Sequence, residues 1–169
     1  MKTEIKMKKI LVSACLVGEP VRYNGVAMEF DNQILKYWRS IGLVVPICPE
    51  VAGGLPVPRP SSEIFGGDGS QVLKGLKKVI NVNGLDVTQY FLEGAQKTLL
   101  LARFHKIKLV ILKEGSPSCG SSYIYDGSFS KIKKSGKGVT TVLLEQNDIR
   151  VFSELEIHGA DKYLKTLII

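Results

Sequence analysis

ILVSAC, residues 10–15, is a compact apolar run with β-branched side chains that ends at a cysteine. Because glycine and proline follow it, the run predicts a short buried strand that opens into a loop. Residues 43–47 and 109–112 show the same pattern, and each is followed by a cysteine, directly or after a turn-rich stretch. Two shorter apolar runs predict further strands, at 79–82 and 149–152.

Apolar residues at helical spacing predict helices between these strands. The expected helices run from a cap at Asp31 to Ile41, from a cap at Thr88 to His105, over residues 139–146, and from Leu155 into the tail. The stretch 49–69 is dense in glycine and proline, so a long ordered loop is expected there. Strands that alternate with helices predict an α/β fold: a single domain over residues 1–169, Rossmann-like, with a mostly parallel sheet and helices on both faces.

The composition is that of a soluble globular protein, with 44% hydrophobic and 23% charged residues among 169. No apolar stretch approaches the roughly 20 residues of a membrane helix, so no membrane partner is expected. The net charge of +7 either attracts anions or simply aids solubility. Aromatic residues are not interleaved with the lysine clusters, so stable nucleic-acid binding is not expected and a small anionic substrate is favoured.

The N-terminus resembles a lipoprotein leader, with basic residues and an apolar run before Cys15. That run has only about five residues, below the 7–15 of a leader core, so we expect the segment to be retained and the protein to be cytoplasmic. Three cysteines cannot form a closed set of disulfides. In a reducing compartment they are expected to be buried and inert, catalytic, or metal-binding.

All three cysteines fall at, or just past, the end of a predicted strand. Cys15 and Cys48 end the first two strands, and Cys119 lies in the turn after the strand at 109–112. The carboxyl ends of parallel strands line one edge of a sheet, where ligands bind. The three thiols are therefore predicted to converge, although they lie far apart in the sequence.

The ligand set distinguishes several kinds of site. Structural zinc prefers four ligands, usually with C-x-x-C pairs, and this chain has no such pair. A [4Fe–4S] cluster takes four thiolates, so three would leave one iron open as a Lewis acid. A cysteine nucleophile lacks a credible histidine partner, because neither His105 nor His158 is placed beside a cysteine. Three cysteines that pack as small hydrophobes remain the structural alternative.

The residues around the cysteines favour a functional site. Cys48 lies in CPE (48–50), which puts Glu50 beside it, and Cys119 lies in SPSCG (116–120), between the serines and a glycine. Glycine and proline here would shape a tight backbone around a bulky cofactor, although ordinary turn formation explains each one singly. Glu63, Asp86 and Asp126 are interpreted as caps or turn formers.

Five segments, taken together, resemble the thiouracil desulfidase family nearly end to end. They are VSACLVGEPVRYNG (12–25), PICPEVAGGLPVPRP (46–60), GLDVT (84–88), LKEGSPSCG (112–120) and IYDGSF (124–129). Asn24 stands where the family pattern leads us to expect an aspartate. The resemblance implies a [4Fe–4S] cluster held by Cys15, Cys48 and Cys119, with the fourth iron open to substrate or hydrosulfide. It also implies that Glu50 and Ser116 are the catalytic residues.

The implied activity is non-redox, hydrolytic removal of sulfur from thiolated uracil compounds such as 4-thiouracil, 4-thiouridine or its monophosphate. A thiocarbonyl sulfur is soft and suits an open iron, and Glu50 would be the base for an attacking water. Ser13 and Ser118 beside the cysteines, and Arg22 and Arg59 in the loops, are the candidate substrate-binding residues. The alternatives are an iron–sulfur redox or sulfur-sensing protein without turnover, and an enzyme of tRNA sulfur metabolism.

Overall fold

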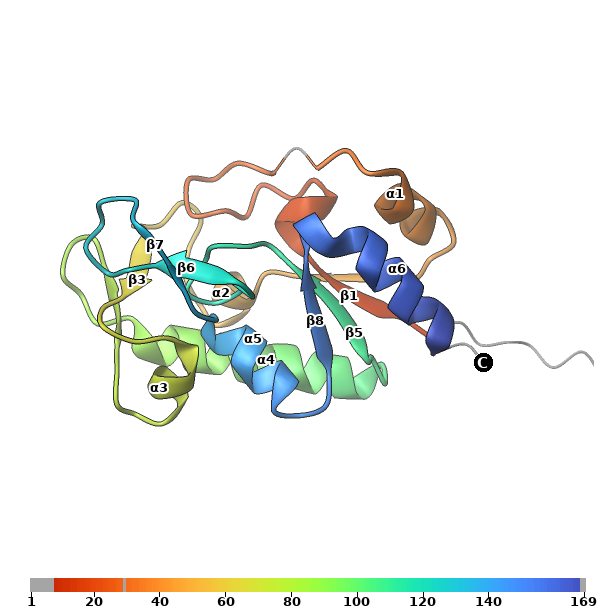
Figure 1. Cartoon of the computed structure of the whole chain (residues 1–169). Helices are drawn as coiled ribbons and strands as arrows, with labels where there is room; N and C mark the ends of the chain where they lie inside the picture. Colours follow the sequence, from red (N-terminus) through yellow and green to blue (C-terminus); the bar gives the residue numbers. More distant parts are fainter. Residues whose placement is uncertain (1–7, 29, 168–169) are drawn as a thin grey trace, which may run out of the picture.

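The computed structural model describes residues 8–28 and 30–167, so the first seven residues of the leader-like segment lie outside the described residues. Its central sheet has the strand order β2-β1-β5-β8, and every neighbouring pair is parallel. The four strands follow the predicted apolar runs closely (Figure 1): β1 (Ile10–Ser13), β2 (Val44–Ile47), β5 (Leu109–Leu112) and β8 (Arg150–Ser153).

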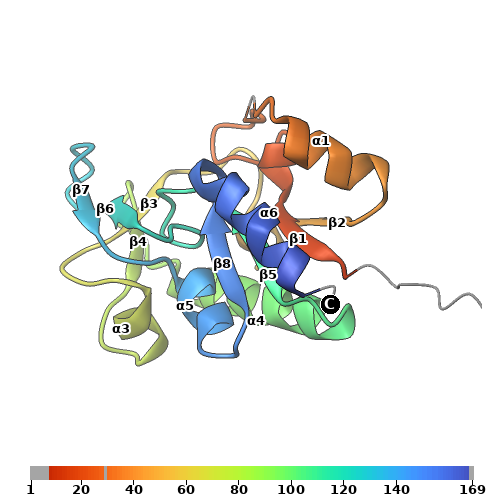
Figure 2. The ribbon, with the colours of Figure 1, turned by 45° about the vertical axis from the view of Figure 1, so that its right-hand side comes forward.

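Two pairs of helices cover the two faces of this sheet. Figure 2 shows α4 (Thr88–Phe104) and α5 (Val139–Glu145) on one side, and α1 (Gln33–Ser40) and α6 (Ile157–Thr166) on the other. Side chains alternate along the strands, so each face has its own core. The predicted single-domain α/β fold with a parallel sheet and helices on both faces is thereby confirmed.

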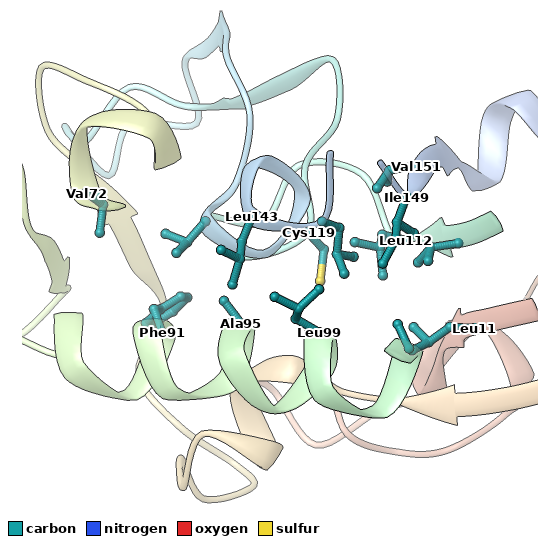
Figure 3. Packing of buried hydrophobic residues seen from close by; sticks show 14 of the residues in the cluster. Leu11, Val72, Phe91, Ala95, Leu99, Leu112, Cys119, Leu143, Ile149 and Val151 are labelled. Carbon is teal, nitrogen blue, oxygen red and sulfur yellow. The ribbon is translucent and has the colours of Figure 1, made fainter. Parts of the chain in front are cut away.

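The two cores contain different residues of the same strands. Toward α4 and α5, Leu11, Leu112 and Val151 belong to one core with Phe91, Ala95 and Leu99 of α4 (Figure 3). Toward α1 and α6, Trp38 and Phe152 belong to the opposite core together with Ile10, Val12, Leu109 and Ile111. Burial on both faces explains why β1 and β5 read as continuous apolar runs.

The stretch 49–69, where a long ordered loop or set of turns is expected, is only partly loop. This stretch holds three short elements, α2 (Pro49–Ala52), β3 (Ser62–Ile64) and the start of α3 (Gly69–Leu73). β3 pairs antiparallel with β4 (Val79–Asn81). Proline is tolerated at the first position of a helix, where α2 has it, and a capping box at Asp68 begins α3.

A β-hairpin near the cavity is also not predicted from the sequence. β6 (Tyr123–Tyr125) pairs antiparallel with β7 (Lys133–Ser135). Two single 3₁₀ turns follow strands directly, η1 (Ala14–Val17) after β1 and η2 (Glu154–Glu156) after β8. Each of these pieces is three or four residues long, which is too short for a periodicity to be visible in the sequence.

Both predicted helix caps are displaced. Asn32, not Asp31, caps α1, because its Oδ1 accepts hydrogen bonds from the backbone N–H of Ile34 at 2.9 Å and of Leu35 at 3.2 Å. Thr88 is the first residue of α4, and the Oδ1 of Asp86 accepts from its N–H at 3.0 Å. Within the described part of the chain, none of the helices is both long and apolar enough to cross a membrane.

Candidate functional site

A cavity of about 400 Å³ opens at the carboxyl edge of the central sheet, and all three cysteines line it. Cys15 lies in η1 directly after β1, and Cys48 precedes the first residue of α2 directly after β2. Cys119 lies in the turn after β5. The structure therefore brings together the three thiols that the sequence spreads over more than a hundred positions.

All three cysteines are free thiols whose charged forms are disfavoured by burial. Burial, together with the neighbouring Cys48, raises the pKa of the Cys15 thiol to about 11, although Lys113 and Arg22 act to lower it. Burial also raises the pKa of Cys48, with a contribution from the charge of Glu50. Burial raises the pKa of Cys119 most strongly, with contributions from Cys48 and Glu50. Since metals bind thiolates, a metal at this site would displace protons as it binds.

Cys119 belongs both to the cavity and to the apolar core. Figure 3 shows its sulfur directed toward the core on the side of Leu99. Its turn is held by the hydroxyl of Ser116, whose Oγ accepts from the N–H of Ser118 at 3.0 Å and from the N–H of Cys119 at 2.9 Å. The start of α5 closes on the same turn, and a Cβ on Gly138 would lie 2.3 Å from the Ser118 carbonyl oxygen. Only glycine permits that approach.

Cys48 and Glu50 are placed by the packing of α2 against α4. The two helices cross at a pair of glycines: a Cβ on Gly94 would lie 2.0 Å from the Pro49 carbonyl oxygen, and one on Gly53 would lie 2.0 Å from the Tyr90 carbonyl oxygen. Backbone therefore lies directly against backbone here. Any larger residue would push α2, with its cysteine and carboxylate, away from the cavity.

Glu50 is the centre of a hydrogen-bonded group inside the cavity. Its Oε2 accepts from Arg59 Nε at 2.7 Å, and its Oε1 accepts from Ser116 Oγ at 3.3 Å. Arg59 is buried and also donates to the carbonyl oxygens of Val21 and Pro56, at 3.1 and 3.2 Å. This pairing stabilises the carboxylate and fixes its direction. The guanidinium of Arg59, a residue predicted to bind substrate, thus forms hydrogen bonds with Glu50 and with two backbone carbonyl oxygens of the protein.

The other predicted substrate-binding residues have different surroundings. Arg22 and Ser13 line the cavity, and Ser13 Oγ accepts from the backbone N–H of Lys113 at 2.9 Å. Ser118 does not line the cavity, because its hydroxyl is buried against Thr140, 2.8 Å away. Asn24 closes a turn, accepting from the N–H of Val26 at 3.3 Å. An amide oxygen is sufficient for that bond.

A charged group next to Cys15 is not predicted from the sequence. Lys113 follows β5 directly, lines the cavity, and pairs with the buried Glu154 at 3.1 Å. Glu114 is buried beside it, and its Oε1 accepts from the N–H groups of Ser121 at 2.7 Å and Ser122 at 3.0 Å. The position after a strand, which identified the cysteines, would also have identified Lys113.

The thiols fit a cluster better than a single ion. No three His, Cys, Asp or Glu side chains within 8–28 and 30–167 are placed to hold one metal ion. Three thiols around a shared cavity, with the cationic Lys113 and Arg22 near Cys15, instead fit a larger anionic group that several thiolates bind together.

Fold and site together define an α/β protein with a three-cysteine cavity at the carboxyl edge of its sheet. The family model of 2-thiouracil desulfurase matches residues 10–156, and the chain belongs to this family. The resemblance seen in the sequence is thereby confirmed.

Two individual proteins are similar over nearly their whole lengths. A solved structure of the [4Fe-4S]-dependent thiouracil desulfidase TudS has a TM-score of 0.86 and 42% identity, covering 94% of this chain and 99% of that one. The Bacillus subtilis (strain 168) protein YbbK, itself uncharacterized, is 46% identical over 151 residues, 88% of this chain and 97% of that protein.

Proposed function

We propose that this chain is a [4Fe–4S]-dependent enzyme that hydrolytically removes sulfur from thiolated uracil compounds such as 4-thiouracil, 4-thiouridine or its monophosphate. The observation that carries the proposal is that three free thiols and the Glu50–Arg59–Ser116 group line one cavity. Membership of the 2-thiouracil desulfurase family and similarity to TudS support it. Free thiols are typical of a reducing compartment, which supports a cytoplasmic enzyme.

Cys15, Cys48 and Cys119 would hold the cluster, which when bound would supply a Lewis-acidic iron, lacking a protein thiolate, for the soft thiocarbonyl sulfur. Glu50 would accept a proton from water as the water attacks the ring carbon that carries the sulfur. Ser116, hydrogen-bonded to Glu50, would pass that proton to the departing sulfur. A thiocarbonyl and water thus give a carbonyl and hydrogen sulfide, with no net electron transfer.

Arg59 has the role of holding Glu50. Its Nε is 2.7 Å from the carboxylate, and two backbone carbonyls fix the guanidinium from the other side. A carboxylate fixed in this way is pre-oriented toward a bound water, which lowers the cost of reaching the reactive geometry. Ser116 joins this base to the Cys119 turn, so base and cluster ligand are positioned together.

The proposal is tested by single-turnover desulfuration in ¹⁸O-labelled water. Anaerobically reconstituted protein is mixed with 4-thiouridine, and released sulfide and uridine are measured together. We expect one sulfide per uridine, with one ¹⁸O atom at the carbon that carried sulfur. Uridine without the label would contradict hydrolysis. An intact cluster spectrum without sulfide release would favour the redox or sulfur-sensing alternative.

A further inference from the structure

Three carboxylates line the cavity, those of Glu50, Glu63 and Glu114. Both oxygens of Glu50 and both oxygens of Glu114 accept hydrogen bonds from the protein. Glu63 differs, because its Oε2 accepts two hydrogen bonds whereas its Oε1 has no hydrogen-bond partner within the described residues. One acceptor at the cavity wall is therefore available to a ligand.

The position of Glu63 is unusual for a carboxylate. It lies in β3 and is only 9% exposed, and it forms no salt bridge with any described residue. Burying a charge without a cation is costly unless hydrogen bonds compensate. The compensating bonds come from the N–H groups of Gly127, at 2.9 Å, and Phe129, at 3.0 Å. They satisfy one oxygen only.

These two bonds also hold the β6–β7 turn against β3, where the turn forms part of the cavity lining. The β6–β7 turn carries Phe129 and Lys131 into the cavity lining, and both have left-handed backbones, with φ of 58° and 61°. Gly127 lies against β3's neighbour Phe65, where a Cβ would be 2.4 Å from its Cα. Since one carboxylate oxygen of Glu63 is held by this turn, the carboxylate plane is fixed and the other oxygen keeps one direction.

We propose that Glu63 is a substrate-binding residue whose Oε1 accepts the ring N–H of a uracil-type base. The inference rests on the proposed function and names the feature of the substrate that is recognised. The N3–H of uracil lies between the two carbons that carry oxygen or sulfur, so 2-thio and 4-thio compounds both present it. A carboxylate only accepts hydrogen bonds, so it selects for that donor.

Glu63→Gln tests the substrate-binding role of Glu63 without removing its hydrogen bonds to the β6–β7 turn. In the variant, the amide oxygen would accept the hydrogen bonds from the Gly127 and Phe129 N–H groups. The opposite orientation is disfavoured, because it would place the NH₂ donor against these two N–H donors. The NH₂ would then replace the acceptor at the cavity and oppose the ring N–H. A hydrogen bond to a charged group is worth about 1.5–3 kcal/mol, so uridine should bind roughly 10- to 100-fold more weakly.

The readout is the dissociation constant of uridine, the unreactive oxygen analogue, measured by calorimetry on holoprotein. Glu93→Gln, an exposed position on α4, is the matched control and should bind uridine as the wild type does. In turnover of 4-thiouridine, Glu63→Gln should raise KM more than it lowers kcat. Unchanged uridine binding by a folded, cluster-loaded Glu63→Gln variant would overturn the proposal.

N3-methyluridine tests the same contact without any mutation. The wild type should bind it about 10- to 100-fold more weakly than uridine, and Glu63→Gln should lose most of that preference. Equal binding of both nucleosides by the wild type, or no binding of uridine, would overturn the proposal. A wild type that prefers uridine yet releases no sulfide would contradict the enzyme function while supporting the role of Glu63.

Discussion

The orientation of the Glu50 carboxylate depends on two side chains, Arg59 and Ser116. Each is itself bound to the backbone, Arg59 to the carbonyl oxygen of Val21 and Ser116 to the N–H of Cys119. Glu50→Gln keeps the shape and removes the proton acceptor. We expect sulfide release from 4-thiouridine to fall by about 10²–10⁴-fold, while cluster absorbance is unchanged. The same measurement on Glu93→Gln should show wild-type rates. Near-full turnover by Glu50→Gln with an intact cluster would mean that the carboxylate is structural.

Glu114 organises the turn that carries Cys119. Burial disfavours its charge, but hydrogen bonds from Ser122, Ser121 and Tyr123 outweigh this and hold the pKa of Glu114 below its ordinary value of 4.5. A pKa that is lowered on folding adds stability that is complete above about pH 4.5 and is lost as pH falls through the folded-state value.

Glu114→Gln should therefore destabilise the protein by about 2 kcal/mol at pH 7, because an NH₂ would face N–H donors. For a chain of this size, the loss corresponds to a melting temperature about 4–8 °C lower. The deficit should begin to shrink below pH 4.5, where Glu114 of the unfolded wild-type chain takes up a proton, and should shrink further as the pH falls through the lower folded-state pKa. Denaturant melts at pH 7 and pH 4 measure this, and a deficit independent of pH would contradict the assignment.

At the residue scale, the sequence predicted the cysteines and missed their supports. Cys15, Cys48 and Cys119 were identifiable because strand ends in a parallel sheet converge. Glu63 and Glu114 were not identifiable, since their partners are backbone N–H groups of distant or turn-forming residues with no side-chain signature. For Ser118, adjacency to a cysteine was misleading, because its side chain is turned toward Thr140.

At the scale of elements, the α2–α4 crossing controls where Cys48 and Glu50 lie. Gly94→Ala puts a Cβ 2.0 Å from the Pro49 carbonyl oxygen, a backbone atom that cannot turn aside. We expect a loss of about 1–3 kcal/mol in unfolding free energy and a loss of cluster retention, seen as faster bleaching of absorbance.

Gly159→Ala is the matched control for that substitution. It is also a glycine inside a helix, but its added Cβ would meet the Phe152 ring at an ordinary 3.6 Å. Alanine is the better helix former, so this variant should be as stable as the wild type or slightly more stable. Equal behaviour of the two alanine variants would contradict the claim that close helix packing positions the site.

Elements with a clear apolar pattern were predictable, and short elements without one were not. The four sheet strands are short but are continuous apolar runs, and the helices α1, α4 and α5 show apolar residues at helical spacing. α2, α3 and the β6–β7 hairpin each span five residues or fewer per element. Their conformation is set by tertiary contacts, such as the Gly53–Gly94 crossing, which local propensity does not reveal.

At the scale of the whole molecule, the proposed cluster would tie together three segments that are distant in the sequence. A ligand that binds only the folded state stabilises it. Holoprotein should therefore melt about 5–10 °C higher than protein stripped of iron by a chelator. Calorimetry under anaerobic conditions measures this. Identical melting temperatures would indicate that iron does not bind the three segments jointly.

Iron and acid-labile sulfide per chain, measured after anaerobic reconstitution, show directly whether the three cysteines hold a cluster. We expect about four of each per chain, with broad visible absorbance, and loss of both in Cys15→Ala, Cys48→Ala and Cys119→Ala alike. Sulfide release from 4-thiouridine should disappear with the cluster. A cysteine variant that keeps full iron content and full sulfide release would contradict a site built from these three thiols.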